Sequence, residues 1–117
     1  MTSADPLLAA RALVLADLAA RGLVDPHTVS VVEDCVAQRR WWLDHWDRGG
    51  EFVVGLVAQD VQDRLFDESQ RWPVCAGCPD PTEHSMTIEP ELGPDPHWVC
   101  SHSGSVVAAL GALQPAD

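Results

Sequence analysis

Three cysteines and two histidines in the last third of the chain have the types and spacing of metal ligands. Cys75 and Cys78 are two residues apart, with a glycine between them, so both thiols can converge on one ion from a tight turn. Cys100 supplies a third thiolate, and we expect His84 to be the fourth ligand. His102 is the alternative, because residues i and i+2 of a strand point to the same face. The sequence therefore predicts a zinc site.

A structural role fits this ligand set better than catalysis. Three thiolates and one histidine fill a tetrahedral zinc site and leave no open position for a substrate. The sequence contains neither H-E-x-x-H nor the H-x-E and P-C-x-x-C pair of deaminases. Cys35 lies apart, beside Asp34 on a helical pattern, and is expected to be a buried, unreactive side chain. We therefore expect no enzymatic activity, and a metal-dependent hydrolase is the third hypothesis.

The segment around these ligands resembles the zinc-bearing tails of small, uncharacterised actinobacterial helical proteins. Those tails contain W-P-x-C-P-x-H-x-H-P-L, then W-x-C-P, then a short apolar strand that ends in Gly and Leu. The matching stretches here are Trp72-Pro73-Val74-Cys75, Trp98-Val99-Cys100 and residues 106–111. Cys78 stands where the pattern has its first His, and His84 matches the second His after a few inserted residues. The resemblance implies a zinc-ribbon-like tail and no particular activity.

Three helices are expected to precede the ribbon. Asp5-Pro6 and Asp25-Pro26 are both N-cap and first-turn signals, and they predict helices up to Arg21 and up to about Asp47. A third helix is expected from about Glu51 to Gln70, where Gly55 would allow a neighbouring backbone to approach closely. Short links between the helices predict an antiparallel bundle over residues 1–71.

Two local expectations concern the sides of these helices. Asp17 and Arg21 have the i, i+4 spacing of an ion pair. The second helix carries an apolar stripe that is interrupted only by Arg39. The stripe consists of Val29, Val32, Val36, Leu43 and Trp46.

The remaining residues, 72–117, predict the ribbon itself. Trp72-Pro73 ends the helical part, because a residue before proline is disfavoured in helical conformation. Short strands are expected at Met86–Glu89, His97–Cys100 and Val106–Leu110. The predicted fold is thus mainly α, with a three-helix bundle followed by a small C-terminal β zinc ribbon.

Two surfaces are candidates for contact with a protein partner or a second copy of the chain. The first helix is apolar around most of its circumference and needs cover on several sides. In the second helix, Arg39, Trp41 and Trp42 are of the residue types that anchor interfaces. Adjacent tryptophans point about 100° apart, so we expect only one of the two to enter the core.

Composition excludes several other classes of function. The chain has 18 acidic and 7 basic residues and a net charge of −11, which argues against binding nucleic-acid backbone or anionic membranes. No signal-peptide or spanning pattern is present in the sequence, so we expect a cytoplasmic protein. The leading hypothesis is a non-enzymatic, zinc-stapled interaction or assembly module. The alternative is an acidic regulator, either a redox-sensing zinc switch or a DNA mimic.

Overall fold

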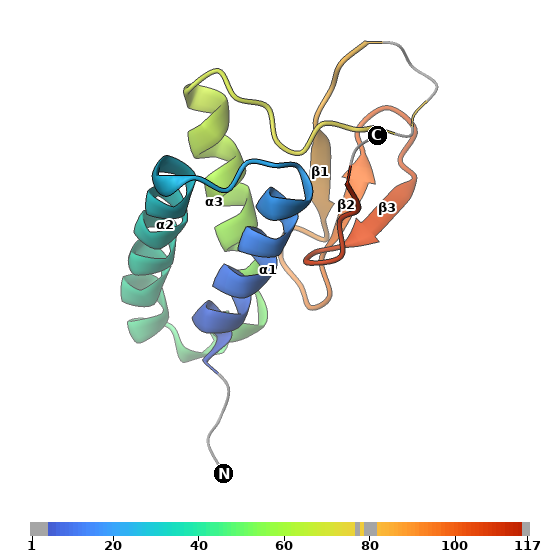
Figure 1. The fold of residues 1–117 in the computed structure, drawn as a ribbon. Helices are drawn as coiled ribbons and strands as arrows, with labels where there is room; N and C mark the ends of the chain where they lie inside the picture. Colours follow the sequence, from blue (N-terminus) through green and yellow to red (C-terminus); the bar gives the residue numbers. More distant parts are fainter. Residues whose placement is uncertain (1–4, 77, 79–81, 116–117) are drawn as a thin grey trace.

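A computed structural model describes residues 5–76, 78 and 82–115 of the chain. It contains three α-helices, α1 (Pro6–Ala20), α2 (Pro26–Asp44) and α3 (Val53–Asp67), with a short 3-10 turn, η1 (Asp47–Glu51), before α3. A three-stranded antiparallel sheet follows, with strands β1 (Met86–Glu89), β2 (His97–Cys100) and β3 (Val106–Ala109). The helices form a bundle, and the sheet stands beside α1 and α3 (Figure 1). The expected three helices and three short strands are confirmed.

The starts of α1 and α2 follow from the two Asp-Pro signals. The Asp5 carboxylate accepts a hydrogen bond from the backbone N–H of Leu7, at 3.0 Å. Asp25 forms a reciprocal capping box with Thr28, whose hydroxyl accepts from the Asp25 N–H. Each proline follows its cap at the first helical position, where its fixed φ suits the helix and no N–H is lost.

The second helix ends earlier than the sequence pattern predicts, at Asp44 instead of about Asp47. Trp46 is already extended, and the chain then reverses through η1. A Cβ on Gly49 would lie 2.5 Å from the Trp42 ring, so the chain can turn here only because this residue lacks a side chain. As a result Trp46 is 42% exposed and not part of the helix stripe that we expected.

The buried face of α2 consists of Thr28, Val31, Val32, Cys35 and Val36. Val32 and Val36 of the predicted stripe are therefore buried, and Val29 and Leu43 are half-buried. The buried face of α3 includes Val57, Ala58, Val61 and Leu65.

Gly55 allows the close approach that the sequence suggested. A Cβ at this position of α3 would lie 3.3 Å from the carbonyl oxygen of Glu91, in the connection between β1 and β2. Because a larger residue would push this connection away, the glycine brings the sheet against the bundle.

The sheet has the order β1-β2-β3, and its register fixes the position of the candidate ligands. Met86 pairs with Cys100, and Ile88 pairs with Trp98. Between β2 and β3 the register shifts next to Val99, which lies opposite Val106, while Trp98 lies opposite Ala108. Val107 is the extra residue of this bulge.

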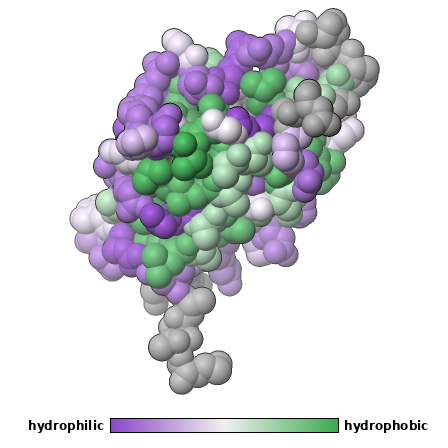
Figure 2. All heavy atoms as spheres, viewed as in Figure 1, coloured by the Kyte–Doolittle hydropathy of each residue, from purple (hydrophilic) through white to green (hydrophobic). Residues whose placement is uncertain are grey.

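A single apolar core extends from the helices to the sheet. Buried residues of the three helices belong to the same cluster as Trp72, Met86, Ile88 and Trp98. The rings of Trp72 and Trp98 pack edge to face, with centroids 5.2 Å apart. Figure 2 shows that apolar residues also reach the surface along α1, where Leu8 is 60% exposed. Among the described residues, no helix combines the length and apolar character needed to cross a membrane.

Candidate metal centre

Backbone hydrogen bonds place Cys75 next to His84. The N–H of Cys75 donates to the carbonyl of His84 at 2.9 Å, and the N–H of Met86 donates to the carbonyl of Pro73 at 2.9 Å. Between these two bonds, Val74 and Ser85 form an isolated antiparallel bridge. The segment that carries the first cysteine therefore runs alongside the start of β1, and the ladder fixes its distance from His84.

The sheet register adds Cys100 to the same place. Cys100 is at the end of β2, opposite Met86, and Met86 follows His84 by two residues. The four ligand atoms of Cys75, Cys78, His84 and Cys100 all lie within 4.8 Å of one another. His84 and Cys100 are buried, and the other two side chains are half-buried. Three distant parts of the sequence thus present three sulfurs and one nitrogen to a single point.

The ring of His84 is oriented as a metal ligand requires. Its Nδ1 lies 2.7 Å from the carbonyl oxygen of Thr82, and because a carbonyl can only accept, Nδ1 carries the hydrogen. In a neutral ring the lone pair is then on Nε2, which lies 3.5 Å from the sulfur of Cys100. A histidine whose second nitrogen donates to a carbonyl is the usual arrangement around protein metal ions.

The thiol of Cys100 is held in surroundings that favour the thiolate. Hydrogen bonds from Ser103 lower the pKa of Cys100 to about 5. The N–H of Ser103 lies 3.4 Å from the sulfur. Thiolates are the form of cysteine that binds metal ions.

His102, the alternative fourth ligand, lies beside this cluster. It is exposed, in the turn after β2, and its ring packs on the ring of His84 with centroids 4.1 Å apart. Its nitrogens are not part of the group of four atoms that converge. The geometry therefore favours His84 over His102 as the fourth ligand.

Asp17 of α1 supports the site, and we did not expect this from the sequence. It is buried, with 1% of its surface exposed. Its carboxylate accepts hydrogen bonds from the indole N–H of Trp98 at 2.8 Å and from the backbone N–H groups of Gly111 and Leu113 at 2.7 and 3.0 Å. Its backbone carbonyl accepts from the indole of Trp72 at 3.3 Å. The sequence did offer one indication of this role, because Asp17 is a lone carboxylate on a helix that is rich in Ala and Leu.

Arg21, one helical turn later, contacts the cysteine segment directly. Its guanidinium donates to the carbonyl of Val74 and, at 3.2 Å, to the carbonyl of Gln114. Burial lowers the pKa of Arg21, whereas the nearby Cys75 and Asp17 raise it. The expected Asp17–Arg21 ion pair is wrong, because both side chains bind other segments of the chain.

The ligand set fits zinc on chemical grounds. Soft thiolates together with one imidazole favour zinc over hard cations such as Mg²⁺ or Ca²⁺. Three thiolates and a neutral histidine around Zn²⁺ carry a net charge of −1, and the cation of Arg21 lies close enough to Cys75 to interact with it. The arrangement could hold one ion, for which the four side chains offer the four ligands of a tetrahedral site.

The three residues predicted to contact a partner differ in how much they are packed against the rest of the chain. Arg39 binds both carboxylate oxygens of Asp60, at 2.7 and 3.0 Å, and its guanidinium lies 5.3 Å from the centre of the Trp42 ring. Trp42 is half-buried and also packs edge to face on Trp46. Trp41 is 65% exposed. Only Trp41 of the three is directed to the surrounding solvent, as expected for one of two adjacent tryptophans.

Cys35 lies away from the cluster, with 1% of its surface exposed. Burial, together with the nearby carboxylate of Asp60, raises its pKa to about 11. This confirms the interpretation of Cys35 as a small core residue that does not form a thiolate at neutral pH.

Comparisons with curated proteins and with solved structures give no match. The profile of one family matches residues 3–110, a span that includes the three helices and all four candidate ligands. The chain therefore belongs to the family described as a domain of unknown function, DUF8819.

Proposed function

We propose that this chain is a non-enzymatic interaction module whose C-terminal part is held together by one structural zinc ion. The observation that carries the proposal is the convergence of Cys75, Cys78, His84 and Cys100 within 4.8 Å. Because these residues come from the segment after α3, the start of β1 and the end of β2, one ion joins parts that hydrogen bonds link only locally. The module resembles a zinc ribbon, with Cys75 and Cys78 forming one half of the site.

The small size of the sheet explains why an ion is useful there. Each strand has four residues, and β3 contributes only exposed or half-buried side chains. So small a unit buries too little apolar surface to be stable alone, and metal binding supplies free energy of folding directly. In this proposal the ion stabilises the fold and does not act on a substrate.

The helices supply the interaction surface in this proposal. Trp41 is the most exposed tryptophan of the described chain, and its neighbour His45 stacks on it with ring centroids 4.3 Å apart. Exposed tryptophan is rare on monomeric surfaces and common at interface centres. A cytoplasmic location suits the reduced thiols that the site requires.

Metal analysis of paired cysteine variants tests the zinc assignment. Purified wild-type protein is expected to contain one zinc per chain by elemental mass spectrometry. Cys78→Ser removes a ligand and is expected to abolish stoichiometric zinc. Cys35→Ala removes a cysteine outside the cluster and is expected to retain one zinc per chain. Equal zinc in both variants, or no zinc in the wild-type protein, would contradict the assignment.

A redox-sensing role is the second candidate, and the close approach of three thiols supports it. Hydrogen peroxide can take two electrons from two of these thiolates, which forms a disulfide and releases the metal while the peroxide is reduced to water. A zinc-sensitive dye would report the released ion. Release by stoichiometric peroxide, reversed by a thiol reductant, would favour this candidate, whereas zinc retained under excess peroxide would exclude it.

A further inference from the structure

The third strand is an open edge of the sheet. In the order β1-β2-β3, β3 pairs with β2, and among the described helices and strands it contacts β2 alone. The opposite edge is different, because β1 lies against α3, and Gln62 of that helix donates to the carbonyl of Met86 at 2.7 Å. The outer side of β3 is therefore the edge of the sheet that no described helix or strand covers.

The side chains of β3 are apolar and exposed. Val106 and Val107 are 66% and 47% exposed, Ala109 is exposed, and Ala108 is half-buried. Natural edge strands usually carry a charge or a proline that prevents pairing with another chain. The stretch Val106-Val107-Ala108-Ala109 contains neither.

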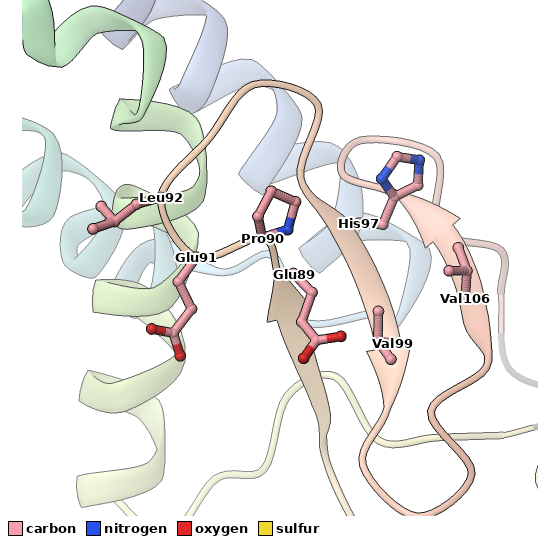
Figure 3. Close-up of a pocket in the computed structure, with 7 residues that line it drawn as sticks. All are labelled: Glu89, Pro90, Glu91, Leu92, His97, Val99 and Val106. Carbon is pink, nitrogen blue, oxygen red and sulfur yellow. The ribbon is translucent and has the colours of Figure 1, made fainter.

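Hollows flank the edge on both faces of the sheet. Val106 lines one of about 670 Å³ together with Val99 of β2, and the far side of this hollow, away from β3, carries Glu89 and Glu91 (Figure 3). Val107 lines the other, of about 520 Å³, with Ala112. Because side chains of a strand alternate between faces, a strand added at β3 would place side chains beside Val106 on one face and beside Val107 on the other.

The charge pattern favours a second copy of this chain as the occupant of this edge. The chain has a net charge of −11, yet between Asp95 and Asp117 it contains no Asp, Glu, Lys or Arg. Two copies of an acidic protein repel each other over most of their surfaces, and the repulsion is weakest where both are uncharged. A short apolar strand is also complementary to itself when a twofold axis places two of them antiparallel.

We propose that two copies of this chain pair antiparallel through β3, so that their sheets become one continuous sheet. This inference goes beyond the proposed function, because it adds a second contact surface, on the sheet and not on the helices, whose partner is a second copy. A strand of four residues buries less than the roughly 1,200 Å² of a typical stable interface. The dimer is therefore expected to dissociate on dilution.

The test is sedimentation of metal-loaded protein from low micromolar to near-millimolar concentration. The wild-type mass is expected to rise from 12.7 kDa towards twice that value. In the pair, Val107→Lys places one charge on the β3 strand of each copy. We expect it to raise the protein concentration at which half of the chains are paired by at least tenfold. Val24→Lys makes the same change at a valine that is 48% exposed between α1 and α2, and it is expected to leave association unchanged. Added salt is expected to strengthen the pair, because it screens the repulsion.

Hydrogen exchange provides a measurement that needs no variant. In the wild-type protein, the amides of residues 106–109 are expected to gain protection as concentration rises, and those of α2 are not. A zinc-loaded wild-type chain that stays monomeric at every concentration would overturn this proposal and leave the metal assignment intact. A dimer that Val107→Lys does not weaken, or one whose protection appears outside β3, would overturn it equally.

Discussion

Asp17 of α1 and Arg21, the residue that directly follows this helix, bind segments on both sides of the candidate metal centre. The carboxylate of Asp17 accepts from Trp98, two residues before Cys100, and from the chain after β3. The guanidinium of Arg21 donates to the residue before Cys75. These two side chains, one helical turn apart, therefore help to position the segments that carry Cys75 and Cys100.

Replacement of Asp17 by Asn tests this role at the residue scale. Asn keeps one acceptor oxygen, but its amide group would face a backbone or indole N–H that also donates. We expect Asp17→Asn to lower the free energy of unfolding by about 2–4 kcal/mol, as for a buried donor left without its acceptor. Urea unfolding measures the loss. Asp67→Asn, on an exposed carboxylate of α3, is the matched control and should stay within about 0.5 kcal/mol of wild type. Equal effects in the two variants would refute the role.

Paired histidine variants test which imidazole completes the site. His84→Ala removes the ring whose Nε2 faces Cys100, so zinc is expected to bind far more weakly. His102→Ala removes the neighbouring exposed ring and is expected to keep one zinc per chain. Substitution with Co²⁺ reports the difference, because tetrahedral thiolate coordination gives strong visible absorption. Loss of that absorption in the His102 variant alone would contradict our assignment.

At the scale of elements, local signals in the sequence were sufficient for most of the fold. The Asp-Pro caps and the short strands each act through neighbouring residues, and the structure confirms them. Gly55 also has the close backbone approach that its residue type indicated, although its neighbour, Glu91, is distant in sequence. Convergence of the candidate ligands also followed from spacing and from residue type. The early end of α2 and the burial of Asp17 did not, because each depends on a tertiary contact. The first arises where Gly49 meets Trp42, and the second where α1 meets the chain after β3.

Docking of the chain after β3 against α1 is tested by a pair of glycines. Gly104 and Gly111 both have positive φ, at 75° and 90°. A Cβ at Gly104 meets nothing within 4 Å, whereas one at Gly111 would lie 2.2 Å from the Leu13 side chain. We expect Gly104→Ala to cost about 1 kcal/mol and Gly111→Ala about 2–4 kcal/mol of unfolding free energy. Urea titrations of both variants give the comparison, and similar costs would show that this contact is not tight.

The two adjacent tryptophans of α2 are expected to respond differently to removal. Trp42 packs on Trp46 and on the backbone at Gly49, so Trp42→Ala should lower the unfolding free energy by about 2–4 kcal/mol. Trp41→Ala should stay within about 0.5 kcal/mol, because its side chain is 65% exposed. Thermal or urea unfolding measures both. A large loss at Trp41 would mean that the residue stabilises the fold and is not reserved for a partner.

For the molecule as a whole, the central claim is that metal binding and folding are coupled. The bundle and the sheet share one core, and one of the candidate ligands, Cys75, packs against it. A chain of this length has a small margin of stability, so the loss of an ion that joins three segments should affect the entire structure. Acidic repulsion within a chain of net charge −11 reduces that margin further.

The most direct test is thermal unfolding of the purified protein before and after removal of metal by a chelator, with zinc then added back. We predict that chelation lowers Tm by at least about 10 °C and that one equivalent of zinc restores it. Circular dichroism follows the helices, and tryptophan fluorescence follows Trp72 and Trp98 near the site. A chelated protein that melts at the same temperature as the untreated one would contradict the claim that a metal ion holds this fold together.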